Sequence, residues 1–348
     1  MGVFLEDVRE QPVVLGRIND FYSEASGQSL LQDAIKLGQD RSVPIILTGM
    51  GSSLFASRAA ATYLWSLGRQ AWFLETSELL HYGLEMLAND CLLILVSQSG
   101  ETVEIKELLS SLSGPVRTIG VTNEINSTLA KSTDVCLPIL AGDEGTTSSK
   151  TYTATLAVLL MLGNRLGEGD FALAQDNIDR ARKRLLDLSE VIPKAILEKT
   201  AARFLQTKTT ALVGRGPGVA TALQGALTIK ELVKIPAEGM EAAQFRHGPL
   251  EIAGSDLAAI VVITPGKTEN LLISLARDLS TCGAQVVTVR RGEISLPQES
   301  GHIDGHDNEP YFSGLTDIYP IQLIAGTFAE KLGHDGTFKW ITKVTSKE

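Results

Sequence analysis

Residues 91–102 read Cys91-Leu-Leu-Ile-Leu-Val-Ser-Gln-Ser-Gly-Glu-Thr102. The apolar run shows no alternation with polar residues, which is typical of a strand buried on both faces of a parallel sheet. The polar loop Ser97–Thr102 follows at once, and a helical pattern covers residues 102–112. A strand, a short loop and a helix in this order predict one unit of an α/β fold.

The same pattern recurs along the chain. Apolar runs end near residues 48, 96 and 122 in the first half, and near residues 213, 264 and 290 in the second half. Similar order at similar spacing predicts two tandem doubly wound α/β domains with parallel sheets. We expect the first domain, with an N-terminal helical segment and a linker helix, to cover residues 1–195. The second domain is expected to cover residues 196–348 and to end in an active-site tail. The charged stretch 172–205 is the linker helix region.

Composition narrows the function classes. The chain has 348 residues, 44% of them hydrophobic, and a net charge of −10. No tract is rich in Lys and Arg, so we expect neither nucleic acid nor an anionic membrane surface as a partner. The longest apolar run, residues 154–163, is too short to span a bilayer, and the N-terminus does not resemble a signal peptide. We therefore expect a cytoplasmic protein.

Cysteine and histidine usage argues against a metal site. The 3 cysteines are scattered, which is typical of reduced thiols in a reducing compartment. The 5 histidines show no metal-ligand spacing, and no CxxC pair is present. We expect no metal and no organic cofactor.

Hydroxyl side chains gather in three loops near the ends of predicted strands or the starts of predicted helices. The loops contain Ser52-Ser53, then Ser97, Ser99 and Thr102, then residues 146–149, which read Thr-Thr-Ser-Ser. Ligands of open parallel sheets bind beyond the carboxyl ends of the strands, and helix N-termini there favour an anion. The pattern therefore predicts a pocket for a phosphate group. The alternative is that these hydroxyls only cap helices.

A nucleotide is the other ligand that the loops suggest. Gly49-Met-Gly51 follows a strand and opens a helix, and Glu75 ends a later apolar run, as in a dinucleotide fingerprint. The third small residue of that fingerprint would fall at Leu54. No Walker motif is present either, so the phosphate-pocket hypothesis is favoured.

Three residues of the second half are candidates for proton chemistry. Glu231 lies in a helical stretch and suits a base that moves a proton between adjacent carbons. His247 lies in a turn and suits ring opening near neutral pH. Lys343 lies in the tail, where it could form an imine or contact a carbonyl. The alternatives are a surface carboxylate paired with Lys230 or Lys234, a structural turn histidine and a solvated tail lysine.

The loop Ser97-Gln98-Ser99-Gly100-Glu101-Thr102 resembles the signature of the sugar isomerase (SIS) family. Gly51-Ser52-Ser53 and Thr147-Ser148-Ser149-Lys150 resemble the family's other phosphate-loop segments, and the opening Glu6–Pro12 is similar to the entry of the isomerase half of glucosamine-6-phosphate synthase. The resemblance covers nearly the whole chain in order.

That resemblance implies roles for individual residues. It implies that Glu231 is the enolising base, that Lys343 is an active-site lysine, and that His247 assists ring opening from the neighbouring subunit of a homodimer. It also implies that the substrate and its phosphate are held by Ser52, Ser53, Ser97, Gln98, Ser99, Thr102 and Ser148.

The chain also departs from the synthase pattern. Thr228 stands where the synthase has a lysine three residues before its base, so a cation near the reacting centre is missing. We also expect no glutaminase domain and no N-terminal cysteine nucleophile. The resemblance then implies a stand-alone glucosamine-6-phosphate deaminase of the isomerase type. The alternatives are an isomerase or deglycase acting on another amino-sugar phosphate, such as a galactosamine or fructosamine phosphate, and a non-catalytic sugar-phosphate sensor.

Overall fold

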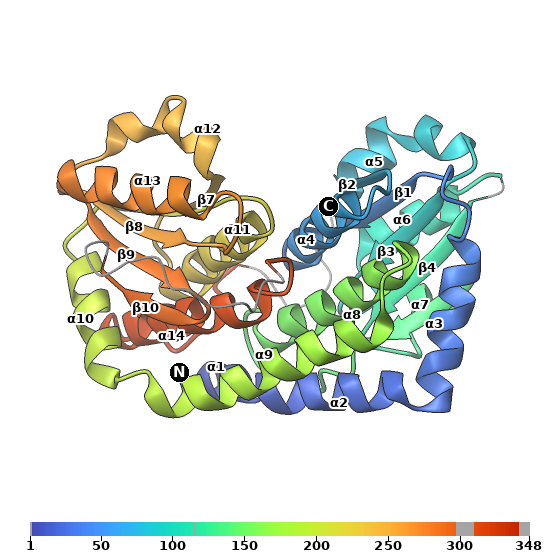
Figure 1. The fold of residues 1–348 in the computed structure, drawn as a ribbon, viewed down its shortest axis with the longest axis horizontal. Coiled ribbons are helices and arrows are strands. Elements are labelled where there is room, and N and C mark those ends of the chain that lie inside the picture. Colours follow the sequence, from blue (N-terminus) through green and yellow to red (C-terminus); the bar gives the residue numbers. More distant parts are fainter. Residues whose placement is uncertain (1, 115, 297–309, 341–348) are drawn as a thin grey trace. The chain divides into compact units, whose positions relative to one another are not determined.

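The computed structural model of the chain describes residues 2–114, 116–296 and 310–340. The described chain forms two compact units, each drawn from more than one stretch of sequence (Figure 1). The N-terminal unit comprises Val13–Glu144 and Lys150–Asp179. The C-terminal unit comprises Met1–Pro12, Gly145–Ser149 and Arg180–Phe338.

The N-terminal unit is built on a 5-stranded parallel sheet in the order β2-β1-β3-β4-β5. Its central strands are fully buried because both faces of the sheet are covered, as their unbroken apolar runs predicted. The strands are β1 (Ile45–Gly49), β2 (Ala71–Glu75), β3 (Leu92–Val96), β4 (Arg117–Thr122) and β5 (Val135–Pro138).

Different helices cover the two faces of this sheet. On one face, residues of α5, η1, α6 and α7 form a single apolar cluster with Leu93 and Leu95 of β3. On the other face, α4 packs on β1 and β2 and also against α8, a helix that is buried along nearly its whole length. The helices of this part of the chain are α2 (Gln11–Ser23), α3 (Ala25–Leu37), α4 (Ser52–Ser66), α5 (Thr76–Tyr82), η1 (Leu84–Ala88), α6 (Val103–Ser111), α7 (Thr128–Ser132), α8 (Lys150–Leu166) and α9 (Phe171–Val191).

The C-terminal unit repeats the plan, with a 5-stranded sheet in the order β10-β9-β8-β6-β7. Strand β10 is the exception, because it forms an antiparallel hairpin with β9. The strands are β6 (Thr209–Gly214), β7 (Ala237–Glu241), β8 (Leu257–Val262), β9 (Gln285–Arg290) and β10 (Glu293–Ser295). The predicted pair of parallel-sheet α/β domains is confirmed.

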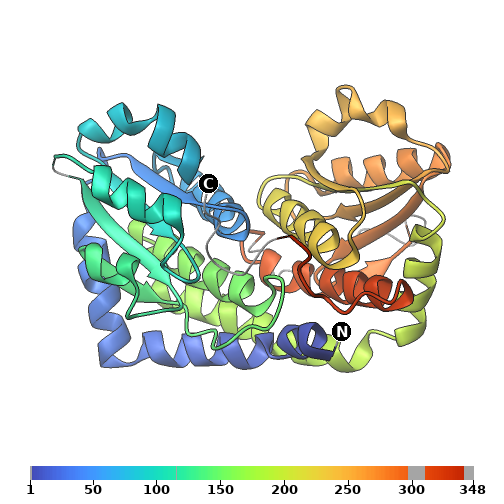
Figure 2. The same cartoon turned by 180° about the vertical axis from the view of Figure 1, so that it is seen from behind.

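The helices of the C-terminal unit include the first helix of the chain. Helix α1 packs against α14, and both views show the two side by side (Figures 1 and 2). A buried hydrogen bond of 2.7 Å from Gln11 to Gln322 holds the N-terminal segment there. The helices are α1 (Gly2–Arg9), α10 (Lys194–Phe204), α11 (Gly218–Thr228), η2 (Ile229–Val233), α12 (Ala242–Arg246), η3 (Pro249–Ile252), α13 (Glu269–Thr281) and α14 (Gly314–Lys331).

The predicted linker helix region is two helices rather than one. Helix α9 ends at Val191 and α10 begins at Lys194. Pro193 lies between them with extended backbone angles, and the residue before a proline disfavours helical angles, so the helix is interrupted here.

Candidate active site

A small polar pocket lies beyond the carboxyl ends of β1 and β3 in the N-terminal unit. Its volume is about 160 Å³, which suits one polar group of a ligand rather than a whole drug-sized molecule. Four hydroxyls and an amide line it. The lining residues are Met50, Ser53, Val96, Ser97, Gln98, Ser99 and Thr102. The structure thus brings together five of the predicted binding residues.

The Ser97–Thr102 loop folds tightly upon itself. The hydroxyls of Ser97 and Thr102 lie 2.8 Å apart, and Ser97 Oγ also accepts the Gly100 N–H at 3.1 Å. Ser99 Oγ accepts the Glu101 N–H at 3.2 Å. A hydroxyl can rotate and serve as donor or acceptor, so these groups can turn their O–H bonds toward a bound anion.

Glu101 fastens the loop to α7. Its carboxylate accepts the backbone N–H of Thr128 at 2.6 Å and the Thr128 hydroxyl at 3.0 Å. These hydrogen bonds lower the pKa of Glu101, because they favour its charged form. The carboxylate is therefore engaged in shaping the loop.

The first turn of α4 closes the other side of the pocket. Gly51 precedes this 15-residue helix with a φ of 52°, and the helix begins with Ser52 and Ser53. A Cβ added at Gly49 would lie 2.8 Å from the Cβ of Ser53, so only glycine lets the helix start this close to β1. Ser53 lines the pocket, whereas Ser52 is half-buried beside it and is not among the lining residues. A helix N-terminus at this position favours a negative charge.

Glu231 lies in the C-terminal unit, on η2, which is one turn of π helix. The side chain is half-buried, and its carboxylate accepts a hydrogen bond from the hydroxyl of Thr147. Lys234 ends the turn in a left-handed conformation, with a φ of 65°, and its ammonium donates to the backbone oxygen of Glu231. π-Helical turns are frequent at functional sites.

His247 is exposed at the end of α12. Its backbone N–H bonds to Gln244 at 3.0 Å, and Gly248 follows with a φ of 136°, so the chain turns sharply after the imidazole. The remaining predicted residues lie elsewhere. Ser148 belongs to the C-terminal unit with Glu231 and His247, and Lys343 lies outside the described residues.

Thr228, at the position of the synthase lysine, is fully buried. Its hydroxyl donates to the backbone oxygen of Gln224 at 3.0 Å, one turn earlier in α11. The position therefore carries a small neutral group that is bonded within its own helix.

Sequence reasoning missed the contact between Thr147 and Glu231. It also missed Gln224, whose side-chain amide donates to the backbone oxygen of Ser148 at 3.2 Å. The residues of these pairs are 84 and 76 positions apart, and periodicity reports only local faces of helices and strands. The run of hydroxyls at residues 146–149 was the available signal, but it did not indicate a partner for any one of them.

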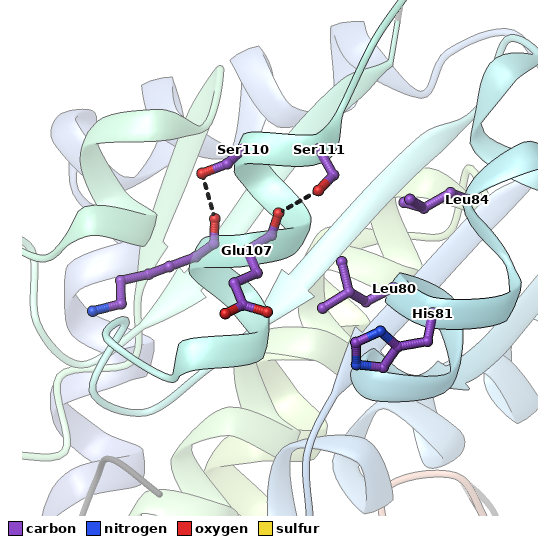
Figure 3. Close-up of a pocket in the computed structure, with 7 residues that line it drawn as sticks. Leu80, His81, Leu84, Glu107, Ser110 and Ser111 are labelled. Carbon is purple, nitrogen blue, oxygen red and sulfur yellow. Dashed lines mark hydrogen bonds between the residues drawn. The ribbon is translucent and has the colours of Figure 1, made fainter. Parts of the chain in front are cut away.

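A second hollow of the N-terminal unit lies between α5 and α6 (Figure 3). It has a volume of about 500 Å³ and contains none of the predicted site residues. The hydroxyls of Ser110 and Ser111 donate to backbone oxygens of their own helix, each at 2.8 Å. The lining residues are Leu80, His81, Leu84, Lys106, Glu107, Ser110 and Ser111.

In residues 2–114, 116–296 and 310–340, no group of His, Cys, Asp and Glu side chains could hold a metal ion, and no helix has the length and apolar character needed to cross a membrane.

Comparison with known proteins places these features in a family. The family model of the SIS domain matches residues 41–165 and 203–329. The isomerizing glutamine–fructose-6-phosphate aminotransferase of Pyrococcus horikoshii is 31% identical over 84% of this chain and 49% of its own length. The chain spans about half the length of such curated relatives.

Two solved structures share the fold over almost the whole chain. The C-terminal domain of the Francisella tularensis glucosamine-fructose-6-phosphate aminotransferase superposes with a TM-score of 0.80 at 20% identity, covering 96% of this chain and 97% of that one. The glucosamine-6-phosphate deaminase of Thermotoga maritima superposes with a TM-score of 0.75 at 18% identity, covering 99% of each chain.

Proposed function

The chain belongs to the SIS domain family, and on that premise we propose that it is an enzyme that converts glucosamine 6-phosphate to fructose 6-phosphate and ammonia. The observation that carries this proposal is the pocket beyond β1 and β3, where the hydroxyls of Ser53, Ser97, Ser99 and Thr102 lie together. An amine-bearing hexose phosphate is chosen because the relative named above is a fructose-6-phosphate aminotransferase and one structural neighbour is a glucosamine-6-phosphate deaminase.

In this proposal, the hydroxyls of the pocket donate to the phosphate oxygens of the substrate. The α4 N-terminus adds its partial positive charge, so that no cationic side chain is needed in the pocket itself. Gln98 offers an amide to the same group. On the resemblance of the sequence alone, Ser52 and Ser148 are also proposed as substrate ligands.

The proposed chemistry begins with ring opening, in which His247 transfers the proton between the ring oxygen and the C1 hydroxyl. Glu231 then removes the proton from C2 of the open-chain aldehyde while the substrate ammonium gives a proton to O1, which leaves an enolamine, and Glu231 returns its proton to C1. The product is a ketimine at C2, which water hydrolyses to fructose 6-phosphate and ammonia. Lys343 is proposed to contact the open-chain carbonyl and hydroxyls.

The exposure of His247 suits donation to a second copy of the chain. We therefore propose a cytoplasmic homodimer in which each His247 serves the site of the partner subunit. A side chain that works in its own chain's site would be expected to be more enclosed, since burial is what tunes catalytic groups.

The test is incubation of the protein with glucosamine 6-phosphate, followed by assays for ammonia and fructose 6-phosphate. We expect both products in equal amounts. Turnover of galactosamine 6-phosphate or a fructosamine phosphate alone would keep the mechanism and change the substrate. Tight binding of all three without turnover would establish a sensor instead.

Glu231→Gln tests the base directly. The variant keeps the shape of the side chain but cannot accept a proton, so we expect exchange of the C2 proton with solvent deuterium to fall by at least about 100-fold. Binding, measured by calorimetry, should change little. Glu198→Gln, a change at an exposed carboxylate of α10, is the matched control. Exchange at the wild-type rate in Glu231→Gln would remove this residue from the role of base.

A further inference from the structure

We propose that Thr147 is a positioning residue for the Glu231 carboxylate, an inference that rests on the proposed role of Glu231 as the base. The Thr147 hydroxyl donates to Glu231 Oε2, although 84 positions separate the two residues in sequence. Thr147 is itself almost fully buried, at 2% exposure. A hydroxyl held in this way presents its proton from a fixed direction.

The loop that carries Thr147 is held on both sides of it. The Gly145 N–H donates to Asp7 Oδ2 at 2.9 Å, and the Ser148 oxygen accepts from the Gln224 amide at 3.2 Å. Gln224 of α11 and Glu231 of η2 both bond to this loop, Gln224 at Ser148 and Glu231 at Thr147. Loop residues 145–149 therefore lie along the α11–η2 segment, with Thr147 beside the carboxylate.

The base is held from the backbone side as well. The π turn of η2 and the Lys234 ammonium fix the main chain around Glu231. A glutamate side chain has several rotatable bonds, so a fixed backbone alone leaves the carboxylate free to move. The Thr147 hydroxyl fixes the far end, and productive proton transfer depends on such positioning.

The same hydrogen bond affects the charge state. A donor to a carboxylate stabilises the ionised form, and only the ionised form of Glu231 can take a proton from the substrate.

Thr147→Val removes the hydroxyl and keeps the shape of the side chain. We expect kcat to fall by about 10-fold to 100-fold with KM changed by less than about 3-fold. The acidic limb of the pH–kcat profile should move to higher pH. Thr147→Ser should restore most of both properties because it restores the donor. Thr221→Val is the matched control, since the Thr221 hydroxyl is buried in α11 with no partner among the described residues.

A second readout separates this inference from the proposed function. Glutamate labelled with ¹³C at the carboxyl is titrated by NMR, and the Glu231 resonance is assigned by its loss in Glu231→Gln. Thr147→Val should move the titration midpoint of that resonance to higher pH, whether or not the wild-type protein turns over an amino-sugar phosphate. An unmoved midpoint, or an active variant with wild-type kcat and pH profile, overturns the role of Thr147.

Discussion

The loops after β3 and β8 hold equivalent places in the two sheets but differ in chemistry. The N–H of Ser97 bonds to the β4 residue Val121 at 3.1 Å, and the N–H of Ile263 bonds to the β9 residue Val289 at 2.8 Å. Each loop then turns at a glycine with a positive φ, which is Gly100 in the first loop and Gly266 in the second. The backbone plan is shared, so the difference between the loops lies in their side chains.

The loop after β8 is followed by a buried ion pair between a carboxylate and a guanidinium of the same chain. Glu269, the first residue of α13, pairs with Arg290 at the end of β9, and both side chains are buried. The Glu269 carboxylate also lies 3.4 Å from the Gly266 N–H. The Glu269 carboxylate therefore faces the C-terminal loop at this helix N-terminus, whereas hydroxyls and an amide line the pocket of the N-terminal unit. We therefore propose that the N-terminal unit binds an anion here, whereas Glu269 fills the corresponding position of the C-terminal unit.

Breaking the ion pair of Glu269 and Arg290 should have the largest effect on stability. Glu269→Ala removes one member of a buried ion pair with the Arg290 guanidinium, which we expect to cost about 3–5 kcal/mol of unfolding free energy. Urea denaturation followed by circular dichroism measures the loss. Glu101→Ala, the control in the N-terminal loop, removes hydrogen bonds to Thr128 but strands no buried cation, so its loss should be smaller. Equal losses of unfolding free energy in the two variants would mean that the buried ion pair does not distinguish the C-terminal loop from the N-terminal loop.

Removing one hydroxyl from the N-terminal loop should have the next largest effect. A hydrogen bond to a charged group contributes about 1.5–3 kcal/mol, so Ser97→Ala should weaken binding of glucosamine 6-phosphate by about 10-fold to 100-fold. Thr264→Val removes a hydroxyl from the C-terminal loop and should leave this affinity unchanged. Calorimetry measures the affinity of each variant for glucosamine 6-phosphate. A loss confined to Thr264→Val would reverse the assignment of the phosphate site.

Much of this comparison could be predicted from sequence. The apolar runs gave the strand ends closely, at 48, 96 and 122 against the observed 49, 96 and 122, because a strand buried on both faces leaves an unbroken signal. Residues 264–269 of the second loop contain two hydroxyl side chains, against three in Ser97–Thr102. The pairing of Glu269 with Arg290 could not be predicted, since the two residues come from different elements and only the sheet order brings those elements together.

The candidate site was harder to predict than the fold. Ser97 and Thr102 belong to one loop, so their joint presence on a pocket follows from local sequence. The placement of residues 145–149 with the C-terminal unit depends on tertiary contacts to Asp7, Gln224 and Glu231. No local pattern encodes such contacts, and the donor of the proposed base was therefore found only in the structure.

The two turning glycines give the smallest and most selective test. Alanine at Gly100 or Gly266 must adopt a positive φ, which costs about 1–2 kcal/mol in either loop. At Gly100 the new methyl would also lie 2.1 Å from Ser127 Oγ, whereas at Gly266 nothing lies within 4 Å. Ser127 caps α7 by accepting the Ala130 N–H, and displacing it costs about 1 kcal/mol more. Denaturation should therefore find Gly100→Ala less stable than Gly266→Ala by about that amount.

Because Leu129 donates to the Gly100 oxygen at 3.0 Å, phosphate affinity should also fall in Gly100→Ala alone. Equal stability of the two variants would show that the N-terminal loop is free to shift away from α7.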